Sequence, residues 1–455
     1  MKNNTICAIS TAQGEGGIGV IRVSGKDSID ICSRLFTSVT GKKLTEMKGY
    51  TAAFGYVSYN GEKLDEVIAT VFREPHSYTG ENVVELSCHG GIFITREVLR
   101  AVIEAGAAPA EAGEFTKRAF LNGKLDLTEA EAVIDIISAK SKTAARAAIS
   151  AKDGALWRRI DSIKIRLVNT AAHLSAWVDY PEEDIEEITA EGLNNTFKEC
   201  MFDLNNLLDT YDMGRTIKEG LDTVIAGKPN TGKSTLMNLL SGRERSIVTD
   251  IPGTTRDVIE ETVNVGNVVL RLSDTAGLRE TDDTVERIGV DIAKNRVLSC
   301  GLVMAVFDSG RELDDDDKRL IEIIKYAPVI AVINKTDLES KLDEKYIADN
   351  IENTVRISAK NGDGVEELIK LIEKIAGTEN FNPSEGILAN ERQRNAVLNA
   401  KNSLNEAIEA LNLGMTYDAV TVTLEEAIEN ILELTGERVS DVVVDKVFHN
   451  FCVGK

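Results

Sequence analysis

The sequence predicts a multidomain fold in which an α/β domain is inserted into an α-helical domain, with an α+β domain before both. The length of 455 residues suggests about three domains, at roughly 150 residues each. Strand-like runs give way to helical periodicity after residue 118, and short apolar runs alternate with helical segments from residue 222 to 376. Helical periodicity then returns. We therefore expect domain segments at residues 1–118, 119–217, 218–378 and 379–455, the second and fourth forming one helical domain.

Composition places the chain among ordinary globular proteins. The 52 Lys and Arg residues against 74 Asp and Glu give a formal net charge of −22, which repels a polyanion unless cations gather locally. The six cysteines lie far apart without a C-x-x-C pair, so neither a zinc ribbon nor a disulfide framework is predicted. The sequence shows no run of ~18 apolar residues and no secretion signal. We expect a cytoplasmic protein with no membrane attachment.

The N-terminal 118 residues are expected to form a compact α+β domain. Strand-like runs at Gly19–Val23, Val67–Phe72 and Val83–Leu86 are separated by Gly-rich turns. The 13 basic and 14 acidic residues of this segment nearly cancel, so the rest of the chain carries the net negative charge. Gly14–Gly19 fits G-x-G-x-x-G, but a strand-like run follows it instead of a helix start. A dinucleotide site is therefore not predicted here.

The helical domain is predicted from apolar residues at three- and four-residue spacing, as in Ala130–Ile137 before the inserted domain and Glu391–Leu411 after it. Pro181 and the acidic residues after it predict a break in the first part. The segment Lys140–Arg166 holds eight basic residues against two acidic ones. This local positive charge either contacts nucleic-acid phosphates or forms a solvated helix face, and the sequence leaves both open.

Residues 227–234 fit the phosphate-binding pattern G-x-x-x-x-G-K-[ST]. Strand-like Val224–Ala226 precedes the pattern and helical Leu236–Leu240 follows it, which is the context that the motif requires. Backbone N–H groups and the helix N-terminus are expected to bind phosphates, Lys233 to reach the β- and γ-phosphates, and Ser234 to ligate Mg²⁺. A Gly-rich turn without a ligand is the alternative, and the motifs downstream disfavour it.

Four further motifs follow, in an order and spacing that resemble translation-factor-related GTPases. By that resemblance Thr255 closes on Mg²⁺ and the γ-phosphate, Asp274 holds a Mg²⁺-bound water, and the Gly277 amide senses the γ-phosphate. Asp337 is suited to accept two hydrogen bonds from guanine, whose donor pair adenine lacks, so guanine is expected. The expected GTP-binding residues are Asn230, Thr231, Gly232, Lys233, Ser234, Thr235, Thr249, Asp250, Ile251, Pro252, Gly253, Thr254, Thr255, Asp274, Thr275, Ala276, Gly277, Asn334, Lys335, Thr336, Asp337, Ser358, Ala359 and Lys360.

The residue after Gly277 is Leu278, where Ras-like enzymes place the Gln that orients the attacking water. Another group is therefore expected to position the water. The candidates in the same switch are Arg279, Glu280 and Glu286, and each has the alternative of being a solvated charge on a loop.

Three features outside these motifs coincide: Gly17–Gly25 (GIGVIRVSG), Gly113–Leu127 (GEFTKRAFLNGKLDL) and the terminal Phe451–Lys455 (FCVGK). Together with the GTPase motifs they resemble the family of tRNA-modification GTPases called MnmE or TrmE, along essentially the whole chain. The resemblance implies a multidomain fold with an α+β N-terminal folate-binding-like and dimerisation domain, a discontinuous α-helical domain and an inserted α/β P-loop GTPase domain.

The family resemblance also implies a function. It implies a potassium-stimulated GTPase that takes part in modifying C5 of the wobble uridine of tRNA, giving aminomethyl or carboxymethylaminomethyl groups. It further implies a homodimer, an FAD-dependent partner of the MnmG type in a heterotetramer, and a one-carbon tetrahydrofolate in the formyl or methylene form. The sequence holds no convincing flavin motif, which is consistent with a separate flavoprotein.

Site residues carry over from the family position by position. The implied folate contacts are Arg22, Glu85, Lys124 and Lys455; the implied potassium ligands are Asn230, Thr249, Ile251 and Thr254; and the implied Mg²⁺ ligands are Ser234 and Thr255. Glu286 becomes the general-base or water-positioning residue, so the catalytic residues are Glu286, Lys233 and Thr255. The chain departs from the family at Ala12 and Gln13, where prolines are common, and at Asn82, where Asp is usual.

Two other functions fit a G domain: a GTP-dependent switch in ribosome assembly and a membrane-attached signalling GTPase. The folate-type N-terminal segment disfavours the first, and Cys452–Lys455 makes a poor prenylation signal, which disfavours the second. A buried residue of a terminal helix is the simplest expectation for Cys452. A surface turn is the simplest expectation for Asp314–Asp317.

Overall fold

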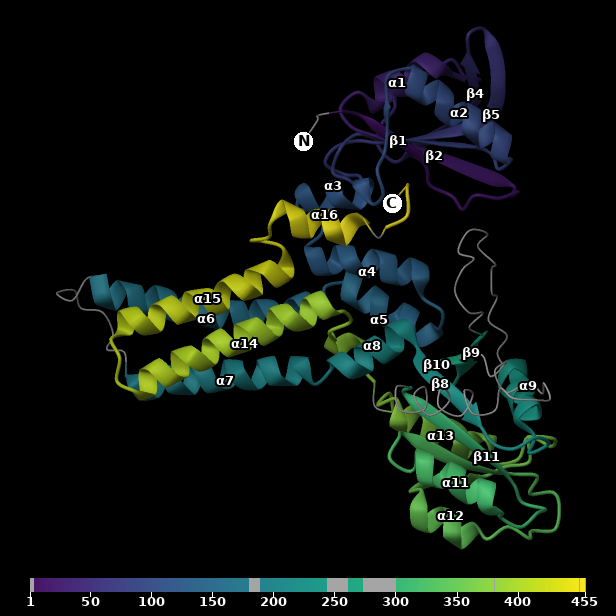
Figure 1. Cartoon of the computed structure of the whole chain (residues 1–455). Coiled ribbons are helices and arrows are strands. Elements are labelled where there is room, and N and C mark those ends of the chain that lie inside the picture. The colour runs from purple at the N-terminus through teal and green to yellow at the C-terminus, as the bar shows by residue number, and fades with distance from the viewer. Residues whose placement is uncertain are drawn as a thin grey trace, which may run out of the picture. The chain divides into compact units, whose positions relative to one another are not determined.

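The computed structural model describes residues 4–179, 189–243, 261–272, 300–379, 381–449 and 451–454. The chain divides into two compact units, and the first is discontinuous in sequence: Met1–Ile134 with Glu429–Lys455, and then Asp135–Ile428 (Figure 1). Among the described residues, no helix has both the length and the apolar character to cross a membrane. The four predicted domain segments, with boundaries at residues 118, 217 and 378, stay predictions.

The first unit is built on a seven-stranded sheet of order β3-β4-β5-β6-β2-β1-β7. The predicted strands at residues 19–23, 67–72 and 83–86 are confirmed within β2, β5 and β6. Successive side chains of a strand point to opposite faces, so Ile21 and Val23 are buried while Arg22 between them faces the other side. The strands are β1 (Ile6–Ile9), β2 (Ile18–Ser24), β3 (Phe36–Ser38), β4 (Thr51–Tyr59), β5 (Glu62–Phe72), β6 (Val83–His89) and β7 (Ala108–Pro109).

The two faces of this sheet differ in what covers them. Helices α1 (Ser28–Leu35) and α2 (Ile92–Glu104) pack on one face, in a core that includes Ile21, Leu86 and Val98. On the other face, α3 (Glu114–Leu121) brings Phe115 into a small buried cluster with Ile6 and Ala8. Phe54 of β4 and Ile68 of β5 are register partners farther along the sheet and remain 50% and 48% exposed.

The C-terminal end of the chain folds into the first unit. Helix α16 (Asp441–His449) packs with α4 (Leu127–Ser138) around Leu127, Val133 and Phe448. Gly113 precedes α3 with a φ of +67°, and a Cβ there would lie 2.6 Å from the carbonyl oxygen of Phe448. Only glycine permits this close approach between two segments far apart in sequence.

The helical part of the second unit confirms the predicted periodicity. Its α7 and α14 pack closely, and capping side chains begin three of the helices: Ser141 for α5, Thr189 for α7 and Asn390 for α14. The predicted break at Pro181 lies outside the described residues. The helices are α5 (Lys142–Lys152), α6 (Ala155–Asp179), α7 (Ala190–Leu208), α8 (Tyr211–Glu219), α14 (Glu391–Asn412) and α15 (Tyr417–Thr435), the last of which continues into the first unit from Glu429.

The predicted α/β segment forms a six-stranded sheet of order β13-β12-β11-β8-β10-β9. Its strands β11 and β12 are almost wholly apolar and buried, as expected for parallel strands with both faces covered. Connections cross to either side of β8, so ligand-binding loops are expected at the carboxyl ends beside it. The elements are β8 (Leu221–Ala226), α9 (Lys233–Arg243), β9 (Glu261–Val265), β10 (Val268–Leu272), β11 (Leu302–Asp308), α11 (Asp315–Ile324), β12 (Val329–Asn334), α12 (Glu344–Asn350), β13 (Asn353–Arg356) and α13 (Val365–Ile375).

Two local expectations are wrong. Asp314–Asp317 is not a surface turn, because Asp314 is the N-cap of α11 and Asp317 completes a capping box with it. Cys452 is exposed and lies beyond the end of α16, so it is not a buried helix residue. The capping box is a local signal that sequence reasoning missed, an Asp followed three residues later by another before an apolar run. The exposure of Cys452 depends instead on how the C-terminal segment packs against Gly113, far away in the chain.

Candidate functional site

The phosphate-binding loop, residues 227–232, joins β8 to α9 at the carboxyl edge of the six-stranded sheet. Helix α9 begins at Lys233, so its N-terminal backbone N–H groups face the loop. Two glycines make the loop possible. A Cβ on Gly227, at φ +140°, would lie 2.4 Å from the Val306 carbonyl oxygen, and one on Gly232, at φ +95°, would lie 2.2 Å from Asn334 Nδ2. Both positions therefore require glycine.

Lys233 lies over this loop. Its Nζ donates hydrogen bonds to the carbonyl oxygens of Gly227 and Lys228, at 2.6 and 2.7 Å. Burial lowers the pKa of Lys233 from its ordinary value, because desolvation disfavours the charged form. Ser234 and Thr235 follow in the first turn of α9 and are exposed. A hydroxyl oxygen at Ser234 is a hard donor of the kind that Mg²⁺ prefers, so the loop fits a Mg²⁺–nucleotide complex.

Residues of three predicted GTP-binding motifs come together around Asn334. This side chain is buried, and its Nδ2 donates to the Thr231 carbonyl oxygen at 2.9 Å. Its Oδ1 accepts from the backbone N–H of Ala359, also at 2.9 Å. One amide thus connects the phosphate loop, the end of β12 and the loop after β13. Thr231, Asn334 and Ala359, which come from three different predicted motifs, are therefore in contact.

Asp337 and Lys335 are held by separate partners. The Ser358 hydroxyl donates to Asp337 Oδ1 at 2.8 Å, which fixes the orientation of that carboxylate. Lys335 has a φ of +63°, and its Nζ lies 2.6 Å from Asp308 Oδ2. Burial opposes ionisation of Asp308, but hydrogen bonds from Lys335 and the Gly310 backbone N–H outweigh it and hold the pKa of Asp308 below its usual range.

Sequence reasoning missed Asp308, although a signal for it exists. Asp308 is the polar residue that ends the buried run Leu302–Phe307, at the same carboxyl edge as the known motifs. Carboxyl ends of parallel strands are where α/β proteins place ligand-binding groups.

Part of the predicted site lies outside the described residues. Thr336 and Lys360 are in the described loops beside Asp337 and Ala359, and Asn230 lies exposed in the phosphate loop at φ +64°. The predicted residues outside the described ranges are Thr249, Asp250, Ile251, Pro252, Gly253, Thr254, Thr255, Asp274, Thr275, Ala276, Gly277, Glu286 and Lys455.

A second group of predicted residues meets on the sheet of the first unit. Arg22 of β2 and Glu85 of β6 are cross-strand partners, and Arg22 Nη2 lies 2.8 Å from Glu85 Oε1. The guanidinium carbon of Arg22 lies 5.5 Å from the ring centroid of Tyr78 and 5.7 Å from that of Phe115. These two aromatic residues, which sequence reasoning missed, hold the guanidinium by cation–π contacts.

The C-terminal segment reaches the same place. The Gly454 carbonyl oxygen accepts a hydrogen bond from Ser10 Oγ at 3.0 Å and one from Arg22 Nη1 at 3.4 Å. Gly454 has a φ of +99°, and a Cβ there would lie 2.3 Å from the Ile9 carbonyl oxygen. Val453 pairs with Ala112 in an isolated β-bridge. The terminal motif therefore belongs to the surroundings of Arg22.

Lys124 contacts the β5–β6 connection, residues 73–82, which also carries Tyr78. Its Nζ donates to the Pro75 carbonyl oxygen at 3.2 Å. Arg22, Glu85 and Gly454 are thus in direct contact, whereas Lys124 shares only this connection with them. The structure shows no direct contact between Lys124 and Arg22 in the described part of the chain.

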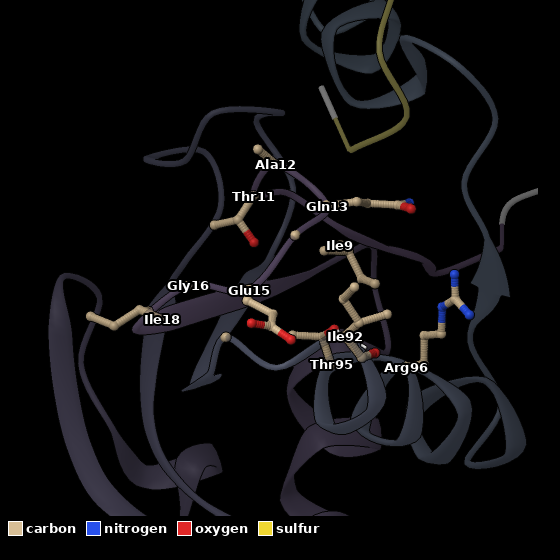
Figure 2. Close-up of a pocket in the computed structure, with 12 residues that line it drawn as sticks. Ile9, Thr11, Ala12, Gln13, Glu15, Gly16, Ile18, Ile92, Thr95 and Arg96 are labelled. Carbon is tan, nitrogen blue, oxygen red and sulfur yellow. Dashed lines mark hydrogen bonds between the residues drawn. The ribbon is translucent and has the colours of Figure 1, made fainter. Parts of the chain in front are cut away.

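A pocket of about 300 Å³ lies beside the β1–β2 connection and the start of α2, and Figure 2 shows the residues that line it. Gln13, Glu15 and Arg96 are its longer polar side chains, and Ile9 and Ile92 give it apolar walls. Two lining residues, Ile9 and Thr11, are the chain neighbours of Ser10, which donates a hydrogen bond to the C-terminal segment. The volume of the pocket lies at the lower end of the range for small-molecule sites.

Comparison with known families decides the assignment. A family model described as the MnmE helical domain matches residues 127–452, and one described as the GTP-binding protein TrmE N-terminus matches residues 5–124. The chain belongs to the MnmE (TrmE) family. It is 41% identical over 456 residues to the tRNA modification GTPase MnmE of Clostridioides difficile (strain 630), covering 100% of this chain and 99% of that one.

Other relatives agree in length and identity. The tRNA modification GTPase MnmE of Thermoanaerobacter pseudethanolicus (strain ATCC 33223 / 39E) is also 41% identical, over 99% of both chains. Among solved structures, the G domain of the T. maritima FeoB iron transporter is 27% identical, with 34% of this chain and 98% of that chain covered and a TM-score of 0.26. The Aquifex aeolicus Era protein is 28% identical, with 40% and 66% covered and a TM-score of 0.28. TM-scores this low carry no argument, so the assignment depends on the sequence matches.

Proposed function

We propose that this chain hydrolyses GTP and that hydrolysis serves the modification of C5 of the wobble uridine in tRNA. One observation supports the GTPase most strongly: the Asn334 amide joins Thr231 of the phosphate loop to Ala359, beside an Asp337 carboxylate fixed by Ser358. The tRNA role is supported by relatives of equal length that are named tRNA modification GTPases. An aminomethyl or carboxymethylaminomethyl group is the proposed modification, in the cytoplasm.

Different residues are proposed to bind the base, the phosphates and the Mg²⁺ of the nucleotide. Asp337 accepts the two guanine donors, and Lys233, held over the loop by the Gly227 and Lys228 carbonyls, reaches the β- and γ-phosphates. Ser234, with Thr255, would hold Mg²⁺, which neutralises phosphate charge when bound. Glu286 is proposed to position the attacking water, in the role that Leu278 does not fill.

Potassium is proposed to stimulate hydrolysis through Asn230, with Thr249, Ile251 and Thr254 as further ligands. Asn230 lies in the phosphate loop, and its side-chain oxygen suits a monovalent cation that offsets developing negative charge. We expect hydrolysis to be much faster in potassium than in sodium, and Asn230→Ala to abolish the difference. Equal turnover of the wild-type chain in both salts, at saturating GTP, would refute this part.

The first unit is proposed to bind a one-carbon tetrahydrofolate, in the formyl or methylene form, through Arg22, Glu85, Lys124 and Lys455. The residues fit the ligand. A guanidinium suits the glutamate carboxylate of a folate, and the Glu85 carboxylate suits the amine and ring N–H of its pterin. The bound folate would supply the one-carbon unit. The Arg22 and Glu85 side chains are only 15% and 26% exposed, so both charged groups are partly shielded from water.

A homodimer is proposed to form through the open face of the same sheet. Phe54 and Ile68 are large apolar side chains, adjacent in register and about half exposed, on the face that α1 and α2 do not cover. A second copy of this chain would bury them. Changing both to Asp is expected to yield monomers in analytical ultracentrifugation. Phe93→Asp is the matched control, since Phe93 is also exposed but lies on α2.

An FAD-dependent partner of the MnmG type, in a heterotetramer, and tRNA complete the proposed assembly. The structure narrows which cations of Lys140–Arg166 are available for RNA. Arg159 donates to the carbonyl oxygen of Gly386, and Arg166 pairs with Asp203, so both are engaged within the protein. Lys142 and Arg146 are exposed four residues apart on one face of α5 and form a basic stripe, and Lys152 is exposed at the end of the same helix.

Charge reversal on α5 tests this stripe. Lys142→Glu with Arg146→Glu is expected to weaken tRNA binding by the partner complex and to lower the log–log salt slope by about one for each lost phosphate contact. Lys345→Glu in α12 is the control for a change of charge alone, because α12 belongs to the α/β part. An unchanged slope would identify the stripe as a solvated helix face.

The function itself is tested in cells that lack this protein. Wobble-uridine nucleosides of their tRNA are measured by mass spectrometry after complementation with wild type or with Lys233→Ala. We expect the C5 modification to return only with wild type. Full modification in uncomplemented cells would refute the tRNA role, and restoration by a Lys233→Ala chain without GTPase activity would separate that role from hydrolysis.

A further inference from the structure

Lys228, the second residue of the phosphate loop, contacts aspartates at the start of α11, and the GTPase motifs do not include this contact. Its Nζ forms a hydrogen bond with Asp314 Oδ1 and lies 3.6 Å from both Asp316 Oδ2 and Asp317 Oδ2. The Lys228 side chain is 19% exposed, whereas its hydrogen-bond partner Asp314 is 54% exposed and Asp317 is buried at 2%. A residue of the loop is therefore tied to the N-terminus of α11, which begins 87 positions later in the chain.

The acidic end of this tie is rigidly held. Asp314 Oδ1 also accepts from the backbone N–H groups of Asp316 and Asp317, at 3.0 and 3.2 Å, as the N-cap of α11. Asp317 is 2% exposed and lies 3.0 Å from Arg311 Nη2. Helix α11 in turn buries Ile321 and Ile324 in the core. The Lys228 ammonium is thus attached to a fixed point of the domain.

The backbone carbonyl of Lys228 contacts Lys233. The Lys228 carbonyl oxygen accepts hydrogen bonds from Lys233 Nζ at 2.7 Å and from Thr231 Oγ1 at 3.0 Å. We propose that Lys228 is a positioning residue for GTP binding and hydrolysis: its side chain, anchored on Asp314 and Asp317, fixes the carbonyl that orients the phosphate-binding Lys233. This inference rests on the proposed GTPase function.

The connection that carries the anchor also reaches the base site. It runs from Asp308, which pairs with Lys335, to Asp314, which pairs with Lys228. One short segment therefore holds a lysine of the base motif at one end and a lysine of the phosphate loop at the other. The contact between Lys228 and Asp314 should affect binding of the phosphates and not binding of the base, and this difference makes the proposal testable.

The experiment compares GDP and GMP binding to the full chain, since only GDP carries the β-phosphate that Lys233 reaches. Lys228→Met is expected to weaken GDP affinity about tenfold, the effect of one lost charge-assisted hydrogen bond, and to leave GMP affinity within about twofold. Lys228→Arg should restore most of the GDP affinity. Asp315→Asn is the matched control, because Asp315 is exposed on the same turn of α11.

Steady-state hydrolysis and a pair of variants complete the test. Lys228→Met should raise the KM for GTP, and adding Asp314→Asn to it should cause little further loss, because both changes break one tie. An equal loss of GDP and GMP affinity, or wild-type GDP affinity in folded Lys228→Met, would overturn the proposal. If Lys228→Met does not fold by circular dichroism, Asp314→Asn takes its place with the same expectations. A wild-type chain without GTP hydrolysis would instead refute the proposed function.

Discussion

The nucleotide site and the Arg22 site are assembled by different routes. At the nucleotide site, each contributing segment is a short window at the carboxyl end of a strand, and the sheet brings the windows together. At the Arg22 site, a hydrogen bond joins Arg22 to Gly454, 432 positions away in the chain. The first arrangement is local in sequence and repeats in many proteins, whereas the second depends on how this particular chain folds back on itself.

The two sites share one device, a glycine that permits close approach. Gly232 and Gly454 both have a positive φ, and a Cβ at either would lie closer than 2.5 Å to another segment. Gly→Ala substitutions at the two positions therefore form a matched pair, one for each site. If the sites are independent, each substitution should weaken or abolish the binding of one ligand and leave the binding of the other unchanged.

The largest effect is expected from Gly232→Ala. The added methyl would lie 2.2 Å from Asn334 Nδ2, and the φ of +95° is unfavourable for alanine. We expect loss of measurable GTP and GDP binding, with formyl-folate affinity unchanged, in titration calorimetry. GDP affinity near that of wild type would show that the loop differs from this arrangement when it holds nucleotide.

Gly454→Ala is expected to have the next largest effect. The methyl would collide with the Ile9 carbonyl oxygen and move the C-terminal segment away from Ser10 and Arg22. Formyl-folate affinity should fall about tenfold, and deletion of Cys452–Lys455 should reduce it at least as much, while GTP affinity stays nearly constant. Equal folate affinity after the deletion would exclude the segment from the folate site.

Asp308→Asn should have a moderate effect confined to the second unit. It removes the carboxylate that holds Lys335, and we expect guanine-nucleotide affinity to fall about threefold to tenfold, in line with a charge-assisted hydrogen bond. Because the folded-state pKa of Asp308 is lowered, its stabilising effect is present above the ordinary aspartate pKa and is lost as pH falls through the lower folded value. Thermal melts of wild type and variant should therefore converge in acid.

The smallest effect concerns His89 in the first unit. His89 Nδ1 lies 2.7 Å from Asp65 Oδ1, and this hydrogen bond and charge raise the pKa of His89 above its ordinary value of 6.5. The stabilisation is complete below pH 6.5 and is lost as pH rises through the folded-state pKa. With His89 70% exposed, the wild type should lose only slightly more stability than His89→Gln over that range in urea titrations. Parallel curves for the two proteins would contradict the pairing.

The sequence alone predicted the local features of the fold well. Strands within β2, β5 and β6, the helix after the phosphate loop, and the long helix from Glu391 all follow from periodicity and the motif pattern. Periodicity did not detect the capping role of Asp314, although its partners Asp316 and Asp317 are local. The exposure of Cys452 depends on how the C-terminal segment packs against Gly113, far away in the chain.

The same distinction applies to the functional residues. Asp337 and Lys233 could be assigned from spacing, since the motif itself fixes their geometry. Arg22 and Glu85 entered only through family resemblance, and nothing local connects them to Tyr78, Phe115 or Gly454. Asp308 lies between the two cases: its place at the end of a buried strand indicates a role, but only the structure identifies Lys335 as its partner.

The most direct test of the account is the nucleotide preference of Asp337→Asn. The central claim is a guanine site in which the Asp337 carboxylate, oriented by Ser358, accepts from the base. An amide at this position offers a donor, which suits the C2 oxygen of xanthine better than the C2 amine of guanine. In competition binding, the account predicts weaker GTP binding and a preference for xanthosine triphosphate. Unchanged preference for GTP in the folded variant would contradict it.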